Sequence, residues 1–311
     1  MTVGGRLAAI LRAGEFCVTG EVVPPRSADG GVVTEQAREL VGYVDAANVT
    51  DNPTGSAHMS ALAGVRFVAA AGVEPTVQVT CRDRNRLGIT ADLLGAWALG
   101  ARNLLCLTGD PLTIGDHPDA KVVNDLSLLD IVGLAKRMRD EGTILSGDEI
   151  AEPPRYLIGV ADMPLADPYE PERIEVKLDA GADVVTTQIA YDVEALSTWA
   201  DLMRPRGLFE RAKVLVGIVP LRSAKAARFM REHLPGVLVP SSLIASLEEA
   251  GNDAEEVGVG LTIDVVQGVR GIVGIAGIHL MGMGRDDIVA RVVEGAGLFP
   301  RPTGVYESEA D

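Results

Sequence analysis

Short runs of β-branched and apolar residues alternate with amphipathic, helix-like segments along the whole chain. This alternation is typical of a parallel sheet whose strands are joined by helical crossovers. The expected strands are Phe16–Val23, Val44–Thr50, Thr76–Cys81, Leu104–Thr108, Tyr156–Ala161, Val184–Gln188, Val214–Val219 and Ile275–Met281. Eight such units in 311 residues favour a closed (β/α)8 barrel, the TIM barrel, over an open sheet.

Helix signals support the same division of the chain. Gly72, Gly100 and Gly181 each end a helix-like stretch just before a strand, where a helix C-cap needs a positive φ. Thr90 and Ser127 are expected to cap the start of two helices. The segment 240–260 is expected to add a helix before the last barrel helix. No domain boundary is visible, so we expect one barrel domain over residues 1–311.

Polar residues recur two positions apart at the carboxyl ends of five expected strands. The pairs are Thr19 and Glu21, Asn48 and Thr50, Gln78 and Thr80, Thr108 and Asp110, and Thr186 and Gln188. Residues two apart in a strand share a face, and barrel active sites form at the carboxyl ends of the strands. A single pair could be a hydrogen-bonded residue of the barrel interior. Five pairs at one level predict a polar site there.

Three of these positions suggest particular chemistry. Glu21 follows an apolar strand, and desolvation favours the protonated form of a carboxyl group, as a general acid needs; the alternative is a partner for a nearby arginine. Asp110 lies on a tight turn facing the same end, where it can bind a ring N–H group or simply cap the turn. Lys177 borders the apolar face of its helix and can reach a phosphate or a flavin carbonyl, or lie along the surface as an ordinary lysine.

The run from Arg82 to Arg86 places three arginines after the third strand. It is either a local site for an anion or a loop in which arginines and aspartates pair with one another.

The amino-acid composition limits the classes of partner and the compartment that we expect for the protein. The chain has 28 Lys and Arg against 44 Asp and Glu, a net charge of −16, which disfavours nucleic acid as the main partner. No apolar stretch is long enough for a membrane span, and the start of the chain lacks the pattern of a signal peptide. The three cysteines form no metal-binding or disulfide spacing. We therefore expect a cytoplasmic protein with no metal site.

Four segments together resemble the methylenetetrahydrofolate reductase family. They are Gly20-Glu21-Val22-Val23-Pro24-Pro25-Arg26, Leu107-Thr108-Gly109-Asp110, Ala180-Gly181-Ala182-Asp183 and Thr186-Thr187-Gln188, in the family's order and spacing. The resemblance runs from about Gly14 to Gly297 and is to the short, single-domain bacterial and archaeal members. The four motifs are fairly specific only when taken together.

The resemblance implies a TIM barrel and a role in one-carbon metabolism and methionine biosynthesis. Such enzymes reduce 5,10-methylenetetrahydrofolate to 5-methyltetrahydrofolate with NADH or NADPH, through a bound FAD. It further implies that Glu21 protonates the folate, that Asp110 contacts the pterin and tunes the flavin, and that Gln188 hydrogen-bonds the folate. Phe229 matches an aromatic residue that packs on the substrate, if one gap is allowed.

The resemblance also implies a set of flavin contacts, with departures. The residues concerned are Thr50, Gln78, Leu107, Thr108, Gly109, Asp110 and Lys177. Gln78 stands where flavin-binding members often have His, and Thr108 replaces an Arg. The segment 161–169 is shorter than its bacterial counterpart and lacks the His and Glu residues found there. Fewer donors mean weaker flavin binding, so direct hydride transfer from NAD(P)H is the alternative to a flavoprotein.

Two other hypotheses remain open from the residues. One is a barrel lyase or hydrolase that uses Glu21 and the arginine loop on a carboxylated metabolite, although it lacks a strand-end lysine or a metal-ligand cluster. The other is a folate-binding subunit that depends on a separate electron-delivery protein. The number of subunits, including a homo-oligomer, is left open.

Overall fold

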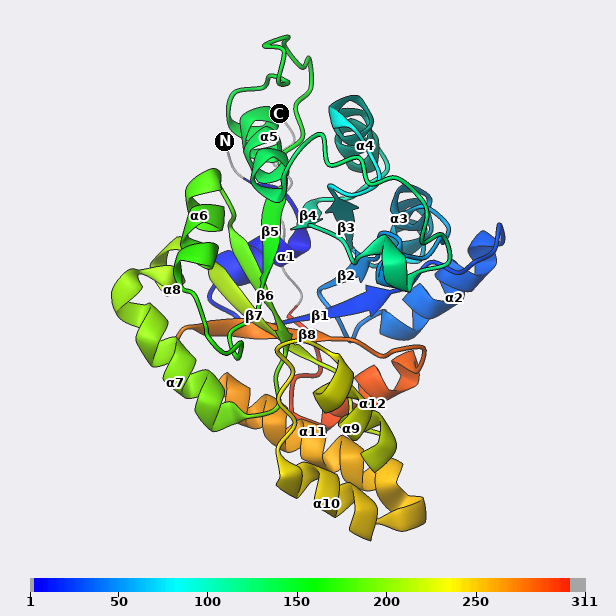
Figure 1. Cartoon of the computed structure of the whole chain (residues 1–311), viewed down its shortest axis with the longest axis vertical. Coiled ribbons are helices and arrows are strands. Elements are labelled where there is room, and N and C mark those ends of the chain that lie inside the picture. The colour runs from blue at the N-terminus through cyan, green and yellow to red at the C-terminus, as the bar shows by residue number, and fades with distance from the viewer. Residues whose placement is uncertain (1–2, 303–311) are drawn as a thin grey trace.

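The computed structural model describes residues 3–302 and shows eight parallel strands closed into a barrel in the order β1 to β8. Helices surround the strands, and the chain runs round the barrel once (Figure 1). The strands are β1 (Cys17–Val22), β2 (Ala46–Val49), β3 (Pro75–Thr80), β4 (Asn103–Leu107), β5 (Leu157–Asp162), β6 (Val184–Ile189), β7 (Lys213–Ile218) and β8 (Ile275–Leu280). The expected TIM barrel is confirmed, and each strand boundary lies within two residues of its expected place.

The barrel strands are joined by helices of very different lengths. The helices are α1 (Arg6–Arg12), α2 (Gly30–Leu40), α3 (Ala61–Ala70), α4 (Arg86–Ala98), α5 (Leu128–Asp140), α6 (Glu172–Ala180), α7 (Val193–Met203), α8 (Leu208–Arg211), α9 (Ala224–His233), α10 (Ser241–Glu249), α11 (Ala254–Arg270) and α12 (Asp286–Gly295). Short 3-10 turns occur at η1 (Pro53–Gly55), η2 (Leu112–Ile114), η3 (Arg204–Arg206) and η4 (Gly251–Asp253).

The caps show where sequence signals succeed and fail. Ser127 caps α5 with a capping box to Asp130, as expected. Gly72, Gly100 and Gly181 have φ of 94°, 110° and 121°, which confirms their role at helix ends. The Thr90 prediction is wrong: α4 begins at Arg86, because the Asn85 side chain accepts the backbone N–H of Gly88.

The expected extra helical segment is also present. Between β7 and β8 the chain forms α9, α10 and α11, which extend to one side of the barrel at the bottom of Figure 1. Residues 240–260 include all of α10 and the first turns of α11. The main addition therefore lies before the last strand, and its Pro235 carbonyl, between α9 and α10, accepts from the Gln188 side chain of β6.

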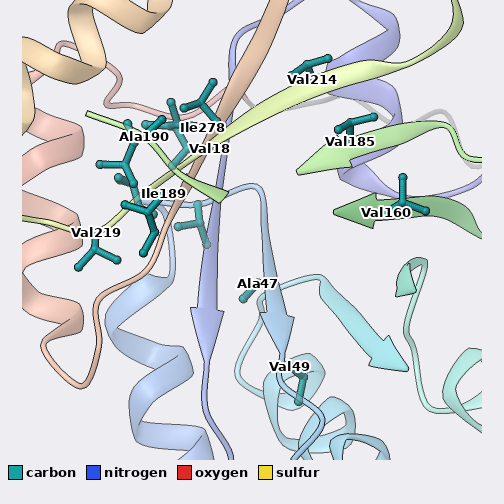
Figure 2. Close-up of a cluster of buried hydrophobic side chains, with 14 of the residues drawn as sticks. Val18, Ala47, Val49, Val160, Val185, Ile189, Ala190, Val214, Val219 and Ile278 are labelled. Carbon is teal, nitrogen blue, oxygen red and sulfur yellow. The ribbon is translucent and has the colours of Figure 1, made fainter. Parts of the chain in front are cut away.

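The apolar core lies between the strands and the helices. Figure 2 shows Val18, Ile278 and Ile189 gathered on the helix-facing side of their strands, and all three are buried. Burying such a side chain stabilises the fold by about 1.5–3 kcal/mol. Because successive residues of a strand point to opposite faces, this packing directs the neighbouring residues Thr19 and His279 into the barrel.

Helix α1 covers the amino-terminal end of the barrel with a small apolar cluster that includes Leu7 and Leu11. The backbone N–H groups of Arg6 and Leu7, at the start of this helix, donate to the Glu74 carboxylate. The opposite end, where the strands terminate, is therefore the one left open for a site. Within residues 3–302, no helix is both long and apolar enough to cross a membrane.

Candidate active site

A cavity of about 470 Å³ opens at the carboxyl ends of the strands, and we call it the mouth cavity. Its lining comes from β1 to β6, β8 and the loops that follow them. The lining residues are Glu21, Asn48, Thr50, Asp51, Pro53, Gln78, Thr80, Leu105, Leu107, Thr108, Gly109, Asp110, Ala161, Asp162, Met163, Thr186, Thr187, Gln188, His279 and Met281. Ligand sites of TIM barrels occur at this end.

Nine of the ten residues in the predicted strand-end pairs line this one cavity. Thr19 is the exception, because it lies deeper in the barrel, where its hydroxyl contacts the His279 ring. Of the residues implied to touch a flavin, all except Lys177 also line the mouth cavity. The period-two pattern therefore predicted the position of the cavity, while the role of each residue stays a prediction.

Glu21 lies at the inner wall of the mouth cavity. Its side chain is 14% exposed, and its Oε2 is 3.9 Å from Nε2 of His279. In the barrel register, Glu21 is paired with Asn48 of β2. The carboxyl group thus faces the cavity with little water around it, as a proton donor to a bound ligand requires.

Asp110 is held at the rim by backbone contacts. Its Oδ2 accepts the backbone N–H of Thr54 at 2.6 Å, and its carbonyl accepts from Arg82 at 2.8 Å. Gly109 has φ of 83°, and a Cβ there would lie 3.1 Å from the Cβ of Thr80, so glycine makes the turn that places Asp110. Asp110 therefore joins the loops after β2 and β4, and it lines the mouth cavity.

The arginine run forms a self-paired network, which confirms the second of the two interpretations given above. Arg82 pairs with Asp83 at 2.7 Å, Arg84 pairs with Asp92 at 2.7 Å and with Asp51, and Arg86 pairs with Asp125 at 2.8 Å. Arg82 is buried. These side chains fix the loops round the mouth and offer no unpaired guanidinium for an anion.

A second pocket of about 370 Å³ adjoins the mouth cavity and shares Thr108, Ala161, Asp162 and Met163 with it; we call it the side pocket. Lys177 lines it and donates from Nζ to the Ala161 carbonyl at 2.6 Å. Burial lowers the pKa of Lys177. Burial also raises the pKa of Asp162, although the Tyr169 hydroxyl donates to this carboxylate at 2.9 Å.

Two implied substrate contacts are placed differently. Gln188 lines the mouth cavity, and its amide is held by the Ile189 N–H at 2.9 Å and the Pro235 carbonyl at 3.3 Å. Phe229 lies on α9 with 56% of its surface exposed and stacks on His233. It is not among the residues that line the mouth cavity, so the geometry gives its implied role no support.

Several polar residues of the site were not singled out from the sequence. Asp51 accepts the Thr80 N–H at 2.9 Å and the Thr80 hydroxyl at 3.0 Å. Asp162 ends β5, and His279 lies in β8. The signal used for Glu21 was a polar residue at the carboxyl end of an apolar strand. Asp162 fits the same signal and could have been predicted from it. His279 gave no such signal, because no second polar residue accompanies it.

Asp286 begins α12 close to Glu21. Burial, with Glu39 and Glu21 nearby, raises the pKa of Asp286 to about 6. A carboxyl group whose pKa is raised by folding does not destabilise the fold at a pH below its pKa in the unfolded chain. The loss of stability develops as pH rises through about 4 to 6, where the group must ionise. We therefore expect Asp286→Asn to raise the free energy of unfolding by about 2 kcal/mol at pH 8 and hardly at pH 4. Urea unfolding at the two pH values measures this, and an equal change at both would contradict it.

The charge of the mouth cavity is negative. Four carboxyl groups line it, from Glu21, Asp51, Asp110 and Asp162. Arg84 pairs with Asp51, Arg82 lies near Asp110, and Lys177 lies near Asp162. Among the described lining residues there is neither Lys nor Arg, and the one basic side chain is the imidazole of His279. Within residues 3–302, no group of His, Cys, Asp and Glu side chains is arranged to hold a metal ion. Such a lining favours a ligand that becomes positively charged as it reacts.

Comparison with known proteins agrees with this geometry. Residues 6–297 match the family model described as methylenetetrahydrofolate reductase. The 5,10-methylenetetrahydrofolate reductase of Salmonella typhimurium is 25% identical over 74% of this chain and 72% of its own length. Methylenetetrahydrofolate reductase 1 of Schizosaccharomyces pombe is 27% identical over 73% of this chain, but the match spans only 36% of that relative.

Among solved structures, an uncharacterized protein from Clostridium thermocellum, described as binding two copies of 5-methyl-5,6,7,8-tetrahydrofolic acid, superposes with a TM-score of 0.61. It covers 93% of this chain and 97% of its own at 14% identity, so it supports the fold alone. The family match, in contrast, covers nearly the whole described barrel, including the strand ends that form the mouth cavity. The chain therefore belongs to the methylenetetrahydrofolate reductase family.

Proposed function

We propose that the protein reduces 5,10-methylenetetrahydrofolate to 5-methyltetrahydrofolate with a reduced nicotinamide nucleotide. The observation that carries the proposal is that Glu21, Asp110 and Gln188, which the family resemblance implies for folate, line one cavity. They come from β1, the loop after β4 and β6. Their convergence is independent of the family match, because closure of the barrel alone brings these strand ends together.

The chemistry follows from the charges. Proton donation from Glu21 to N10 of the folate breaks the bond between N10 and the methylene carbon. An iminium cation then forms at N5, and a hydride delivered to the methylene carbon completes the methyl group. Carboxylates aimed at developing positive charge in a poorly hydrated site stabilise such a cation. Glu21 supplies the proton, Asp110 binds ring N–H groups at the rim, and Gln188 orients the folate.

The lining fits a flavin only in part. Thr50 has a buried hydroxyl without a partner, and Gln78 and Thr108 offer further hydrogen bonds to a polar ring. The diphosphate of FAD, however, needs fixed positive charge. In the side pocket Lys177 donates to a carbonyl and Arg173 pairs with Glu170, while Asp162 adds a negative charge. The described residues therefore do not fit the diphosphate of a resident flavin.

This mismatch favours direct transfer from the nicotinamide as the route of the hydride. A resident cofactor must be held by fixed charges between turnovers. A donor that arrives and leaves in each cycle needs only its ring inside the cavity, with its diphosphate in water. The same residues serve in either route, because proton donation by Glu21 depends only on the folate.

The test is an absorbance spectrum of the purified protein followed by an NADH and NADPH oxidation assay with methylenetetrahydrofolate, with and without added FAD. We expect turnover without FAD and no flavin absorbance at about 450 nm. A flavin band that NADH bleaches, or turnover only with FAD, would overturn the direct route and leave the reaction in place. Folate binding without turnover under either condition would favour a partner-dependent subunit, and absence of folate binding would refute the proposal.

A further inference from the structure

Helix α4 is apolar on the side that faces away from the barrel. It lies on the outside of the molecule, between α3 and α5 (Figure 1). One side of the helix packs on the core through Ile89, Leu93 and Ala96. The opposite side consists of four exposed residues at helical spacing, which we call the α4 stripe: Leu87, Ala91, Leu94 and Ala98. A helix that is apolar on all sides is normally covered on all sides.

The outer side of α7 shows the pattern that a surface helix usually has. Its exposed residues include Glu194, Thr198 and Asp201, which lie on one side of the helix. In α4 the two charged residues, Arg86 and Asp92, both lie away from the stripe. The stripe therefore presents only leucine and alanine to the surroundings, and Leu87 is 76% exposed.

The side chains of the stripe alternate between large and small. Leu87 and Leu94 are seven residues apart, as are Ala91 and Ala98, and seven residues make nearly two helical turns. When a second α4 runs antiparallel to the first, Leu87 faces Ala98 of the second copy, and Leu94 faces its Ala91. Each leucine then packs on an alanine, which fills the space between two helices well. A parallel pair would instead place leucine on leucine and alanine on alanine.

We propose that the protein forms a two-fold symmetric dimer in which the α4 stripes of two copies pack against each other in antiparallel orientation. In such a dimer every contact occurs twice, so the surface must be complementary to itself. The order of large and small residues in the stripe has this property. The occupant of the stripe is therefore a second copy of this chain, and the proposal does not depend on the reaction that the protein catalyses.

The distribution of charge permits contact at this surface. The net charge of −16 makes two copies repel each other, so they approach most easily where acidic residues are few. Helices α3 and α4 contain one acidic residue between them, Asp92, and Arg84 pairs with it at 2.7 Å. The one charged residue of α3 is Arg66. A second acidic copy therefore meets little repulsion at the surface formed by α3 and α4.

The area of this surface suits a weak dimer. A Cβ on Gly95 would lie 3.6 Å from the Leu62 side chain, so α3 and α4 pack closely side by side. Helices of this length are about 15–20 Å long and about 10 Å wide, so contact across both buries roughly 800–1,000 Å² in total. This is near the lower limit of about 1,000 Å² for a specific interface. We therefore expect a dissociation constant of about micromolar size.

The first test is the mass of the protein in solution, measured by sedimentation velocity from about 0.5 to 100 μM. We expect a change from the mass of one chain to that of two across this range. Leu94→Glu places a charge near the two-fold axis and should raise the dissociation constant by about 100-fold or more, because a buried unpaired charge is unfavourable. Ala91→Glu should have the same effect. A wild-type protein that stays monomeric, or variants that dimerise as wild type does, would overturn the proposal.

A matched control and a salt series show what holds the dimer together. Leu202→Glu replaces another leucine of an outer helix, α7, that is 49% exposed, and this variant should dimerise as wild type does. Because Leu94 is exposed in the single chain, Leu94→Glu should unfold at the same temperature as wild type in dilute solution. Added salt screens the repulsion between two acidic copies and should tighten the dimer. A dimer that salt weakens would be held by ion pairs, and this would overturn the proposal.

The second test distinguishes the antiparallel arrangement from a parallel one. Cysteine is introduced at one position of the stripe, and a short bismaleimide joins cysteines that face each other. The native cysteines Cys17, Cys81 and Cys106 are buried. We expect a mixture of Leu87→Cys and Ala98→Cys to give a crosslinked dimer and each variant alone to give none. Crosslinking of Leu87→Cys to itself would show a parallel pair and overturn the arrangement.

Discussion

Glu21→Gln is expected to lower the rate of methylenetetrahydrofolate reduction by about 10²–10⁴-fold, the range for loss of a general acid. The amide has nearly the shape of the carboxyl group, so the mouth cavity should keep its form. It cannot donate an acidic proton to N10, and the five-membered ring then stays closed. Since the nicotinamide binds without this proton, its affinity should change little.

The measurement is kcat for NADH oxidation with the folate, together with calorimetric binding of the folate to wild type and variant. We expect the loss in kcat and a change of no more than a few-fold in folate affinity. Glu35→Gln, an exposed carboxyl on α2, is the matched control and should behave as wild type. A Glu21→Gln enzyme with wild-type kcat, or one whose whole defect is lost folate binding, would contradict the assigned role.

The alternation of strand-like and helix-like segments predicted most of the fold, and the alternation of polar and apolar residues within the strands predicted the position of the cavity. Glu21 and Thr108 lie at the ends of apolar strands, and a barrel has only one face where such ends meet. Gly181 was predicted to end a helix because glycine readily adopts the backbone conformation of a C-cap, and it does end α6. This preference is local, and tertiary contacts did not change it. Predictions that rest on local chemistry of this kind were confirmed.

The one wrong cap and the arginine run that was left open share another cause, which is competition between neighbouring groups. Thr90 can cap a helix in isolation, but Asn85 lies earlier and captures the Gly88 N–H, so the helix starts there and the Thr90 hydroxyl bonds back to the Arg86 carbonyl. The arginine run likewise has several aspartates within reach, and only the folded loops determine which pairs form.

The contact between His279 and Glu21 could not be predicted from spacing. It depends on β8 closing against β1, which joins residues 260 positions apart, such as Thr19 and His279. The closure depends on the number of strands and on their register. The residues next to His279 or Glu21 in the sequence determine neither of these properties. Sequence therefore predicted the level at which polar groups gather more reliably than it predicted which groups touch.

Asp45→Ala is expected to lower the free energy of unfolding by about 3–5 kcal/mol, a large part of the total for an ordinary domain. The Asp45 carboxylate is fully buried and pairs with Arg301, whose side chain is 3% exposed, at 2.6 Å. It also accepts the Val18 N–H at 2.8 Å and approaches Arg6 at 3.3 Å. Alanine would leave the Arg301 charge buried without its carboxylate partner. The contacts by which Asp45 joins α1, β1 and the end of the described chain would also be lost.

Urea unfolding of the variant gives the loss, and a second variant identifies its cause. In Asp45→Ala with Arg301→Met no buried charge remains, so we expect the double variant to be more stable than Asp45→Ala alone. Asp201→Ala removes an exposed pair with Arg204 and should change stability by less than about 1 kcal/mol. A loss in Asp45→Ala no larger than in Asp201→Ala would show that the buried pair contributes little. A double variant less stable than the single one would mean that packing by the Arg301 side chain, rather than its charge, is what Asp45 supports.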